Sequence, residues 1–486
     1  MELQRGYKTA VNKLSRSLVG ALCLFCLWSV SASAATYYIG TDGDDRNSGS
    51  AVTEAWATFG RAWSQLQPGD TLVLLDGLYT EPLEPNGSSG TPEQPITIQA
   101  QHDGQAVIDG QGVNIPVHLY RDHYQIEGIV ARNGGHAVYY VSGSHNTLRR
   151  VSGYNASTDG NSSVFMLYDA QHNVIEDCIA VGTGRKMLVI YRGSHNIIRR
   201  CFADWRSWDG RSWCDDWPWG DNIQIYNGDY NIIENSIGFG SVPVWSISVH
   251  ANSLDATAIG NRVLGSISIY AGMNHDGSIK RWPSQRPQPT DCTAHRDFGW
   301  PSQRAGFALY GNGQVRDNLF RDILAWGSAG LGLTAILDGD HGNNVADHVT
   351  LLNNGLDNPL GWGGVGTELR SEELHLWDQL SELWVEGREE TGAGARLTHR
   401  YVDGKLTNLP LWPWPMEARL QSELGLSPTT LVISILRQWE MRTTLSLPLI
   451  QDGVLIYPPQ VPTRPLAHGA KFDKVDSLYY DDGDRF

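Results

Sequence analysis

Four near-copies of one phrase constrain the fold of this chain more than any other feature. The phrases read HNTLRR, HNVIED, HNIIRR and YNIIEN, and they begin at His145, His172, His195 and Tyr230. Their starts lie 27, 23 and 35 residues apart. A period near 23 is too short for most helical repeats but long enough for one coil of a β-solenoid. The repeat therefore predicts short strands in coils that stack on one another.

A strand is expected before each phrase, because apolar residues alternate in HAVYYVSGS, SVFMLYDAQ, KMLVIYRGS and DNIQIYNGD. Successive side chains of a strand point to opposite faces, so one alternate set should face the core. That set comprises Val138 and Tyr140, Phe165 and Leu167, Leu188 and Ile190, and Ile223 and Ile225. Leu148, Ile175, Ile198 and Ile233, within the phrases, should form a second interior column.

The other positions of the phrase have structural explanations. Asn146, Asn173, Asn196 and Asn231 should form an amide ladder that satisfies the backbone of successive turns. The histidines beside them are interpreted as corner residues, since no further metal ligand accompanies them. Glu127, Arg149, Glu176, Arg199 and Glu234 alternate in sign. We expect them on an exposed face, where each pair adds about 0–1 kcal/mol and fixes register.

The first 34 residues have the features of a secretory signal peptide. A basic start precedes the apolar run LVGALCLFCLWSV, and Ala32-Ser33-Ala34 is a small-residue cleavage signal. No later segment is long and apolar enough to cross a bilayer. We therefore expect a secreted protein (extracellular, periplasmic or at the cell surface) without a transmembrane segment after cleavage.

Charge argues against nucleic acid as a partner. The net charge is −16, and removal of the four basic and one acidic residues of the signal would leave −19. Nucleic-acid binding depends on neutralising phosphates, whereas a local basic patch would suffice for an anionic polysaccharide. Of the later cysteines, Cys178 and Cys201 should be stacked, buried thiols. Cys214 and Cys292 can pair if the compartment is oxidising.

The N-terminal region carries a family resemblance. A strand, TYYIG, leads to a Gly/Asp-rich loop, and Phe59, Ala62, Trp63 and Leu66 then share one helical face that can cover an open coil end. QPGD and PITIQA follow. Over about residues 36–355 the chain resembles secreted right-handed parallel β-helix proteins of the pectate-lyase-like superfamily, which include polysaccharide lyases.

The resemblance implies an all-β fold, a right-handed parallel β-helix with an N-terminal capping helix. We expect a cap and first strands over 35–100, the β-helix over 101–355, and an irregular, partly helical tail over 356–486. LHLWDQLSELWVEG and MEARLQSELG are the helical stretches of that tail. The tail can cap the C-terminal end or fold along one side.

Outward aromatic residues mark one candidate site. Tyr168, Tyr191, Tyr226, His250 and Tyr270 should form an exposed track in successive coils. Such a track either binds sugar rings or is a stacking ladder that stabilises the sheet.

The longest insertion, DWRSWDGRSWCDDWPWGDN, lies beside this track. Trp208, Trp213 and Trp217 suit carbohydrate binding, and Asp215, Asp216 and Asp221 suit Ca²⁺, the candidate cofactor where none is certain. A self-packed loop with solvated acids is the alternative.

Positive and titratable residues flank this insertion. A polysaccharide lyase must neutralise a uronate carboxylate and remove the neighbouring proton, and Lys186, Arg192 and His250 are the candidates for that chemistry. A hydrolase would need two carboxylates about 5–10 Å apart, and the sequence does not select a pair. No complete active-site motif is present. The sequence favours a lyase or epimerase acting on an anionic polysaccharide; the alternatives are a non-catalytic carbohydrate-binding protein and a structural envelope protein.

Overall fold

The structure is a computed structural model. It describes residues 34–158, 160–207, 220–240, 245–273, 304–337, 339–352, 354, 365–367, 399–432, 450–451 and 454–455. The chain divides into two units, Met1–Ala35 and Thr36–Phe486, and the second contains the fold described below. The expected signal peptide and the expected helix in LHLWDQLSELWVEG lie outside the described residues. No helix among the described residues has the length and apolar character that a membrane crossing needs.

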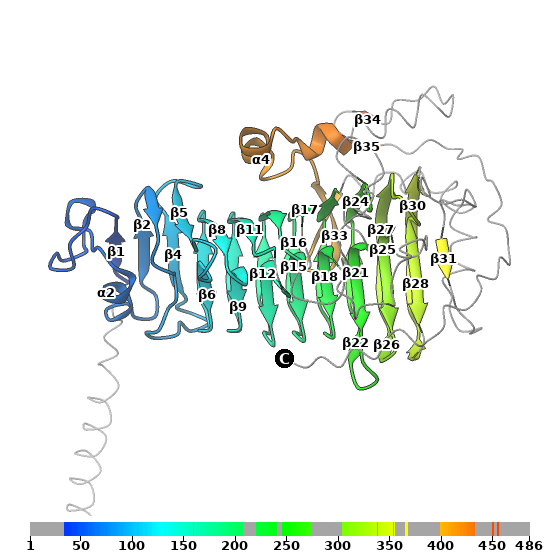
Figure 1. Cartoon of the computed structure of the whole chain (residues 1–486), viewed down its shortest axis with the longest axis horizontal. Coiled ribbons are helices and arrows are strands. Elements are labelled where there is room, and N and C mark those ends of the chain that lie inside the picture. The colour runs from blue at the N-terminus through cyan, green and yellow to red at the C-terminus, as the bar shows by residue number, and fades with distance from the viewer. Residues whose placement is uncertain are drawn as a thin grey trace, which may run out of the picture. The chain divides into compact units, whose positions relative to one another are not determined.

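Three faces of parallel strands build the coils (Figure 1). Face 1 contains β1 (Thr36–Ile39), β2 (Thr71–Leu74), β4 (Ile96–Ala100), β7 (Tyr124–Glu127), β10 (Thr147–Arg149), β13 (Val174–Glu176), β16 (Ile197–Arg199), β19 (Ile232–Glu234) and β23 (Arg262–Leu264). Face 2 contains β3 (Gly77–Tyr79), β5 (Ala106–Asp109), β8 (Val130–Gly134), β11 (Ser152–Ala156), β14 (Ile179–Thr183), β17 (Phe202–Ser207), β20 (Ile237–Phe239) and β24 (Ile267–Ile269). β27 (Leu319–Trp326) pairs with both β23 and β24, and β30 (Val345–Leu352) follows it.

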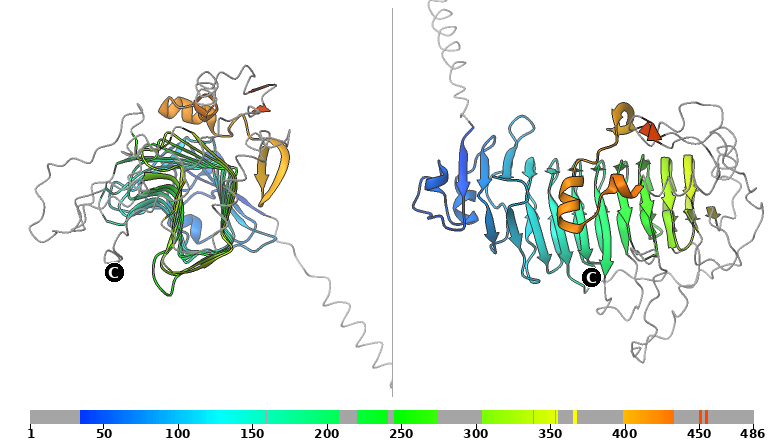
Figure 2. Two further views of the ribbon diagram at one scale, coloured as in Figure 1. Left: turned by 90° about the vertical axis from the view of Figure 1, so that its right-hand side faces the viewer. Right: turned by 90° about the horizontal axis from the view of Figure 1, so that it is seen from above.

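Face 3 is a separate sheet of nine strands. It contains β6 (Val117–Leu119), β9 (Ala137–Val141), β12 (Ser163–Tyr168), β15 (Lys186–Tyr191), β18 (Asp221–Tyr226), β21 (Trp245–Ala251), β25 (Ala305–Gly311), β28 (Leu333–Leu337) and β31 (Val365–Thr367). A small parallel sheet of β22 (Thr257–Ile259), β26 (Gln314–Arg316) and β29 (Asp340–Gly342) lines the corner that follows. Viewed end on, the strands of successive coils superpose as the sides of one tube (Figure 2). The predicted right-handed parallel β-helix is confirmed.

The interior columns hold the coils in register. Leu148, Ile175, Ile198 and Ile233 are direct partners on neighbouring strands of face 1, and all four are fully buried, as predicted. Phe165, Leu188 and Ile223 form the corresponding column on face 3.

For one predicted pair, Val138 lies in the core as expected but Tyr140 does not, because the alignment is off by a single residue. Tyr139 and Val141, rather than Val138 and Tyr140, align with Phe165 and Leu167. Val141 precedes Asn146 by five residues, whereas Leu167 precedes Asn173 by six, so alignment on the repeated phrase slips by one at β9. The phenol of Tyr139 donates to the Ile129 carbonyl at 3.1 Å, which lets this polar group lie in the core.

The asparagine ladder is confirmed. Each backbone N–H donates to the side-chain oxygen of the asparagine one coil further on, at 2.9 Å from Asn146 to Asn173, from Asn173 to Asn196 and from Asn196 to Asn231. Each amide nitrogen in turn donates to a turn carbonyl, as Asn196 does to Ala170 at 2.9 Å. The turns therefore satisfy their buried backbone groups from coil to coil.

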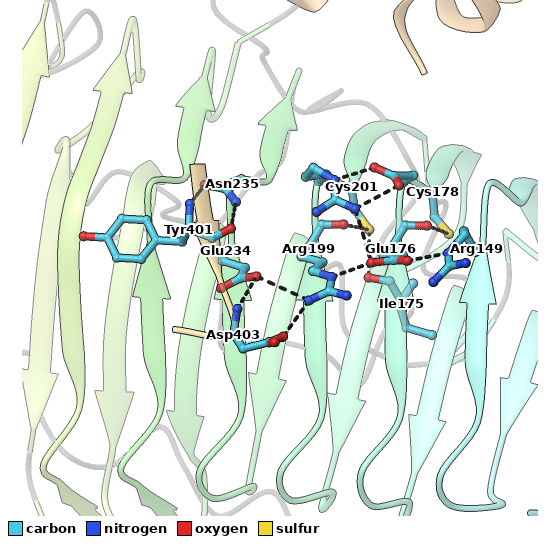
Figure 3. A network of polar contacts seen from close by, with 12 residues as sticks. Arg149, Ile175, Glu176, Cys178, Arg199, Cys201, Glu234, Asn235, Tyr401 and Asp403 are labelled. Carbon is cyan, nitrogen blue, oxygen red and sulfur yellow. Dashed lines mark hydrogen bonds and ion pairs between the residues drawn. The ribbon is translucent and has the colours of Figure 1, made fainter. Parts of the chain in front are cut away.

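The charged column forms (Figure 3), but two of its glutamates are buried and its other members are only half-exposed. Glu176 retains 3% of its exposure and Glu234 none. Glu176 accepts from Arg149 and, at 2.5 Å, from Arg199. Arg199 also lies 4.0 Å from Glu234. The alternation of sign was therefore predicted correctly, whereas its solvation was not.

The C-terminal tail explains part of this burial, because it folds along the side of the coils (Figures 1 and 2). Its hairpin is β32 (His399–Val402) and β33 (Lys405–Pro410). At the hairpin turn, the backbone N–H groups of Asp403 and Gly404 donate to Glu234 at 3.2 and 3.0 Å. Asn235 exchanges two hydrogen bonds with the Tyr401 backbone, at 2.9 and 2.7 Å.

The tail then covers the outer side of face 2. Helix α4 (Glu417–Leu424), predicted from MEARLQSELG, places Leu420 in an apolar cluster with outward residues of β14, β17, β20 and β24. Leu411, Trp414 and Met416 belong to the same cluster. Two short strands, β34 (Ile450–Gln451) and β35 (Val454–Leu455), form a further hairpin.

The N-terminal helix is also present. The 3₁₀ turn η1 (Val52–Glu54) precedes α2 (Phe59–Trp63), which buries Phe59, Ala62 and Trp63 against the first coil. The hydroxyl of Thr58 caps the helix by accepting from Arg61 N at 3.2 Å. Cys178 and Cys201 are buried free thiols, as expected, whereas Cys214 and Cys292 lie outside the described residues.

Candidate functional site on the outer side of face 3

Strand register aligns three rows of side chains across face 3, and contacts of Lys186 with the Tyr226 ring and of Asp221 with Gln224 place these groups on its outer side. The first row contains Ser163, Lys186, Asp221 and Trp245, and the second contains Met166, Val189, Gln224 and Ser248. The third contains Tyr168, Tyr191, Tyr226, His250 and Tyr310. Each row runs across the coils, so residues that are 23 to 60 positions apart in sequence become neighbours.

Tyr168, Tyr191 and Tyr226, here called the tyrosine column, stack face to face. Their ring centroids are 5.3 and 5.0 Å apart, and the ring planes differ by 8° and 9°. The faces are therefore covered by one another, and the ring edges and hydroxyls point away from the stack. The expected ladder is present, and contact with a sugar would use hydroxyls and edges rather than the ring faces.

Tyr270 does not belong to this column, contrary to the expectation. It directly follows β24 on face 2, where its ring packs 4.9 Å from Trp326 in the cluster beneath the tail. Tyr310 occupies the expected place after His250, at 5.4 Å. The segment SISIY alternates like a face 3 strand, but the next strand of face 3 begins only at Ala305.

The column is also less exposed than expected. Tyr168 and Tyr226 are half-buried, whereas Tyr191 retains 7% and His250 4% of their exposure.

Lys186, Asp221 and His250 come together in the middle of this surface. Lys186 and Asp221 are partners on adjacent strands, and the Lys186 ammonium lies 4.8 Å from the centre of the Tyr226 ring. Lys186 retains 4% and Asp221 3% of their exposure. Burial raises the pKa of Asp221 to about 7, although the positive charges of Lys186 and Arg185 act in the opposite direction.

Gln224 links the two titratable groups. Its amide nitrogen donates to Asp221 Oδ2 and lies 3.4 Å from both ring nitrogens of His250. Burial, with the nearby charges of Lys186 and Arg185, holds the pKa of His250 well below its usual range. The imidazole is therefore neutral near pH 7 and can accept a proton.

Arg192 lies apart from this group, at the turn that follows β15. It forms an ion pair with Asp169 at 2.7 Å and donates to the Tyr168 hydroxyl at 2.6 Å. Its guanidinium also lies 4.9 Å from the centre of the Tyr168 ring. Hydrogen bonding to Asp169 raises the pKa of Arg192, so the side chain remains a fixed cation beside the tyrosine column.

The remaining predicted site residues lie outside the described residues. These are Trp208, Trp213 and Trp217 and the two aspartates Asp215 and Asp216. Sequence reasoning missed Gln224, Trp245 and Tyr310. The alternation in DNIQIY contained the signal for Gln224, because it places that residue on the same face as Tyr226.

Comparison with known proteins finds sequence similarity over part of the chain. A family model described as chondroitinase B matches residues 54–210. Pectate lyase L from Dickeya dadantii is 25% identical over 282 residues, which cover 52% of this chain and 62% of that protein. Pectate lyase L from Dickeya chrysanthemi matches with the same identity and coverage. The chain thus spans 62% of the length of these two relatives.

Among solved structures, pectate lyase Pel9A matches at a TM-score of 0.41 and 16% identity over 66% of this chain and 80% of that chain. A PL6 family polysaccharide lyase from Pseudopedobacter saltans matches at a TM-score of 0.33 and 13% identity, over 57% of this chain and 63% of that chain. The strand pairing of this chain is that of a parallel β-helix. Over part of its length, its sequence is similar to pectate lyase L and to the chondroitinase B family.

Proposed function

We propose that this protein is an exported lyase that cleaves a uronate-containing polysaccharide by β-elimination. The observation that carries the proposal is the Lys186–Asp221–His250 group, in which a buried cation and a neutral imidazole lie on one surface of face 3. The sequence similarity to pectate lyase L and to chondroitinase B supports the same class of reaction. Export rests on the signal-like N-terminus alone.

Each side chain of the site has a separate role in the proposed elimination. The Lys186 ammonium pairs with the substrate carboxylate and so acidifies the C5–H bond beside it. Neutral His250 accepts the C5 proton, the electron pair forms the C4–C5 double bond, and the C4–O bond breaks. The Tyr226 phenol gives its proton to the leaving oxygen. Asn252 donates to the Tyr226 oxygen at 2.6 Å, a hydrogen bond that uses a lone pair rather than the phenol O–H.

Calcium fits one part of this site. Asp221 Oδ1 and Gln224 Oε1 are buried without a hydrogen-bond partner among the described residues, and both are the hard oxygen ligands that Ca²⁺ prefers. No group of three His, Cys, Asp or Glu converges within the described part of the chain. Asp221 and Gln224 would hold the ion, which would supply a second positive charge for the carboxylate. A rise in melting temperature with Ca²⁺ over EDTA, absent in Asp221→Asn, is the expected result.

The decisive experiment measures the ultraviolet absorbance of the unsaturated uronate that elimination leaves. The wild type should produce it from at least one of pectate, alginate and chondroitin or dermatan sulfate. Lys186→Met and His250→Gln should lower the rate at least about 100-fold. Lys405→Met and His102→Gln, which change an exposed lysine and an exposed histidine elsewhere, serve as matched controls. Full activity in both site variants would refute the assignment.

A second candidate is a non-catalytic carbohydrate-binding protein. The observation in its favour is the 4% exposure of Lys186 and His250 beside the half-buried Tyr168 and Tyr226. A wild type that binds one of these polysaccharides without producing the absorbance would select it. An epimerase would also give no absorbance, but it would exchange the C5 hydrogen with deuterated solvent.

A further inference from the structure

A second column of rings lies on the corner between face 3 and face 1. It contains His123, His145, His172 and His195, here called the histidine column, and Tyr230 continues it. Successive histidine ring centroids are 4.8, 4.8 and 4.9 Å apart, and the step to Tyr230 is 5.3 Å. All five residues have positive φ, between 55° and 59°, so they project from the same left-handed position of each turn.

The exposed part of this column is a row of ring edges. His145, His172 and His195 are exposed and His123 is half-buried. Because the faces cover one another, solvent meets the edges, which carry the ring nitrogens. A neutral imidazole presents one N–H donor there, and a protonated imidazole presents two donors and a positive charge. The column therefore repeats the same donor once in every coil.

The other charged groups of these turns already have partners. Asp169 is paired with Arg192, and Asp229 accepts from the Thr257 hydroxyl and the Ile259 N–H, both at 2.8 Å. Asp122 accepts from Ser144 N at 2.8 Å, and Arg121 donates to the Asn86 carbonyl at 3.1 Å. Three acids and two arginines leave this strip slightly negative at neutral pH. Protonation of the four histidines would make it positive.

We propose that the histidine column is an acid-gated binding track for an anionic polysaccharide that lies across the coils. The length of one sugar unit in an extended chain is similar to the rise from one coil to the next. Successive carboxylates can therefore meet successive ring edges. The chain would run parallel to the tyrosine column, since Tyr168 and Tyr191 each precede a histidine of the column by four residues. This proposal concerns binding outside the Lys186 group and does not depend on elimination.

Electrostatics explains why the track would respond to acid. Each protonated ring repels its neighbour, and burial together with His145 and His195 lowers the pKa of His172. A polymer that places a carboxylate beside each ring removes this repulsion, so protonation and binding favour each other. A neutral imidazole has no charge to attract a carboxylate, so binding should weaken as the pH rises.

The test compares binding of a defined oligogalacturonate at pH 5.5 and pH 8.0, at low and equal salt. We expect affinity at pH 5.5 to exceed that at pH 8.0 by at least about tenfold, and the gain to fall with added salt. His145→Asn/His172→Asn should lose most of that gain, since asparagine tolerates positive φ without an imidazole. His102→Gln, off the column and 63% exposed, is the matched control and should keep it.

Two readouts separate this proposal from the proposed function. Elimination at pH 8.0 should be unchanged in the double variant, whereas Lys186→Met should abolish elimination and leave the pH-dependent binding gain intact. In the wild type, NMR titration of the imidazole C–H signals should show the histidine pKa values rising when oligogalacturonate is added. An equal pH gain in the double variant, or histidine pKa values unchanged by the ligand, would overturn the proposal.

Discussion

At the scale of single residues, burial decides what the charges of this molecule do. Glu176 is surrounded by Arg149, Arg199 and Arg200, and the Arg199–Glu176 and Arg200–Glu176 separations are 2.5 and 3.2 Å. Burial acts to raise the pKa of Glu176, but hydrogen bonds and charge from Arg199 and Arg149 outweigh it and lower that pKa. The carboxylate is thus the centre of a desolvated cluster. The small free-energy contribution expected of an exposed ion pair does not apply to it.

Reversal of this charge should therefore be severe. Glu176→Lys places a fourth cation at a buried position beside three guanidinium groups, so we expect a loss of at least about 3 kcal/mol in the free energy of unfolding. Urea unfolding followed by circular dichroism measures it. Asp403→Lys, at a side chain that is 66% exposed on the same network, should cost less than half as much. Equal losses would show that the burial of Glu176 does not matter.

The contribution of Asp221 to stability should depend on pH in the opposite direction to that of a carboxylate whose pKa is lowered by folding. Its folded pKa, about 7, lies above the value of about 4 in an unfolded chain. Between these values the folded state keeps a proton that the unfolded state has lost, so this contribution to stability falls as the pH rises from about 4 to 7. Asp221→Asn removes it. The melting temperature of the variant should fall less between pH 5 and pH 7.5 than that of the wild type, and parallel curves would contradict this.

At the scale of elements, the tail is fixed to the coils by few but specific contacts. Asn235 holds the Tyr401 backbone by two hydrogen bonds, and the Tyr401 hydroxyl reaches Asp322. Asn235→Ala should lower the free energy of unfolding by about 1–3 kcal/mol and make the tail more sensitive to protease. The readouts are urea unfolding and the rate of tail cleavage.

Asn133→Ala is the control for this variant. Asn133 also has positive φ, 56° against 50° for Asn235, so both variants carry the same backbone penalty. Its side chain bonds to Asp109 and not to the tail. If the two variants released the tail at equal rates, Asn235 would not be the attachment point.

The sequence predicted the elements better than their surroundings. The alternation before each phrase identified β12, β15 and β18, because inward residues must be apolar in every coil. It failed at β9, where a turn one residue shorter shifts the alignment. It also failed at Tyr270, because the strands of faces 2 and 3 show the same alternation of apolar and polar residues. The docking of the tail on Glu234 and face 2 depends on contacts about 170 residues apart, which no local pattern encodes.

For the candidate site, the sequence supplied the residue types and their outward direction, but not their association. Tyr226 and His250 were expected as outward residues, whereas Lys186 was identified only as a residue that flanks the insertion. That Asp221 joins them, with Gln224 between Asp221 and His250, depends on the register of β15, β18 and β21. Register follows from the packing of whole coils, so it became visible only in three dimensions.

At the scale of the whole molecule, stability is shared along the asparagine ladder. Asn196→Ala leaves the N–H of Asn173 without its acceptor and the Ala170 carbonyl without its donor. Two buried groups without partners should cost about 2–5 kcal/mol in the free energy of unfolding. The neighbouring His195→Asn, at an exposed corner, should cost less than about 1 kcal/mol. Denaturant unfolding of both variants tests this contrast.

The interval of 23 residues between Asn173 and Asn196 makes one coil an interchangeable unit. A duplicated copy of that interval would extend every interior column by one residue. It would also add one tyrosine to the tyrosine column and one histidine to the histidine column. The columns cannot be lengthened independently, because a single backbone turn supplies both. The number of coils would therefore determine how many sugar units of a polymer the surface can contact.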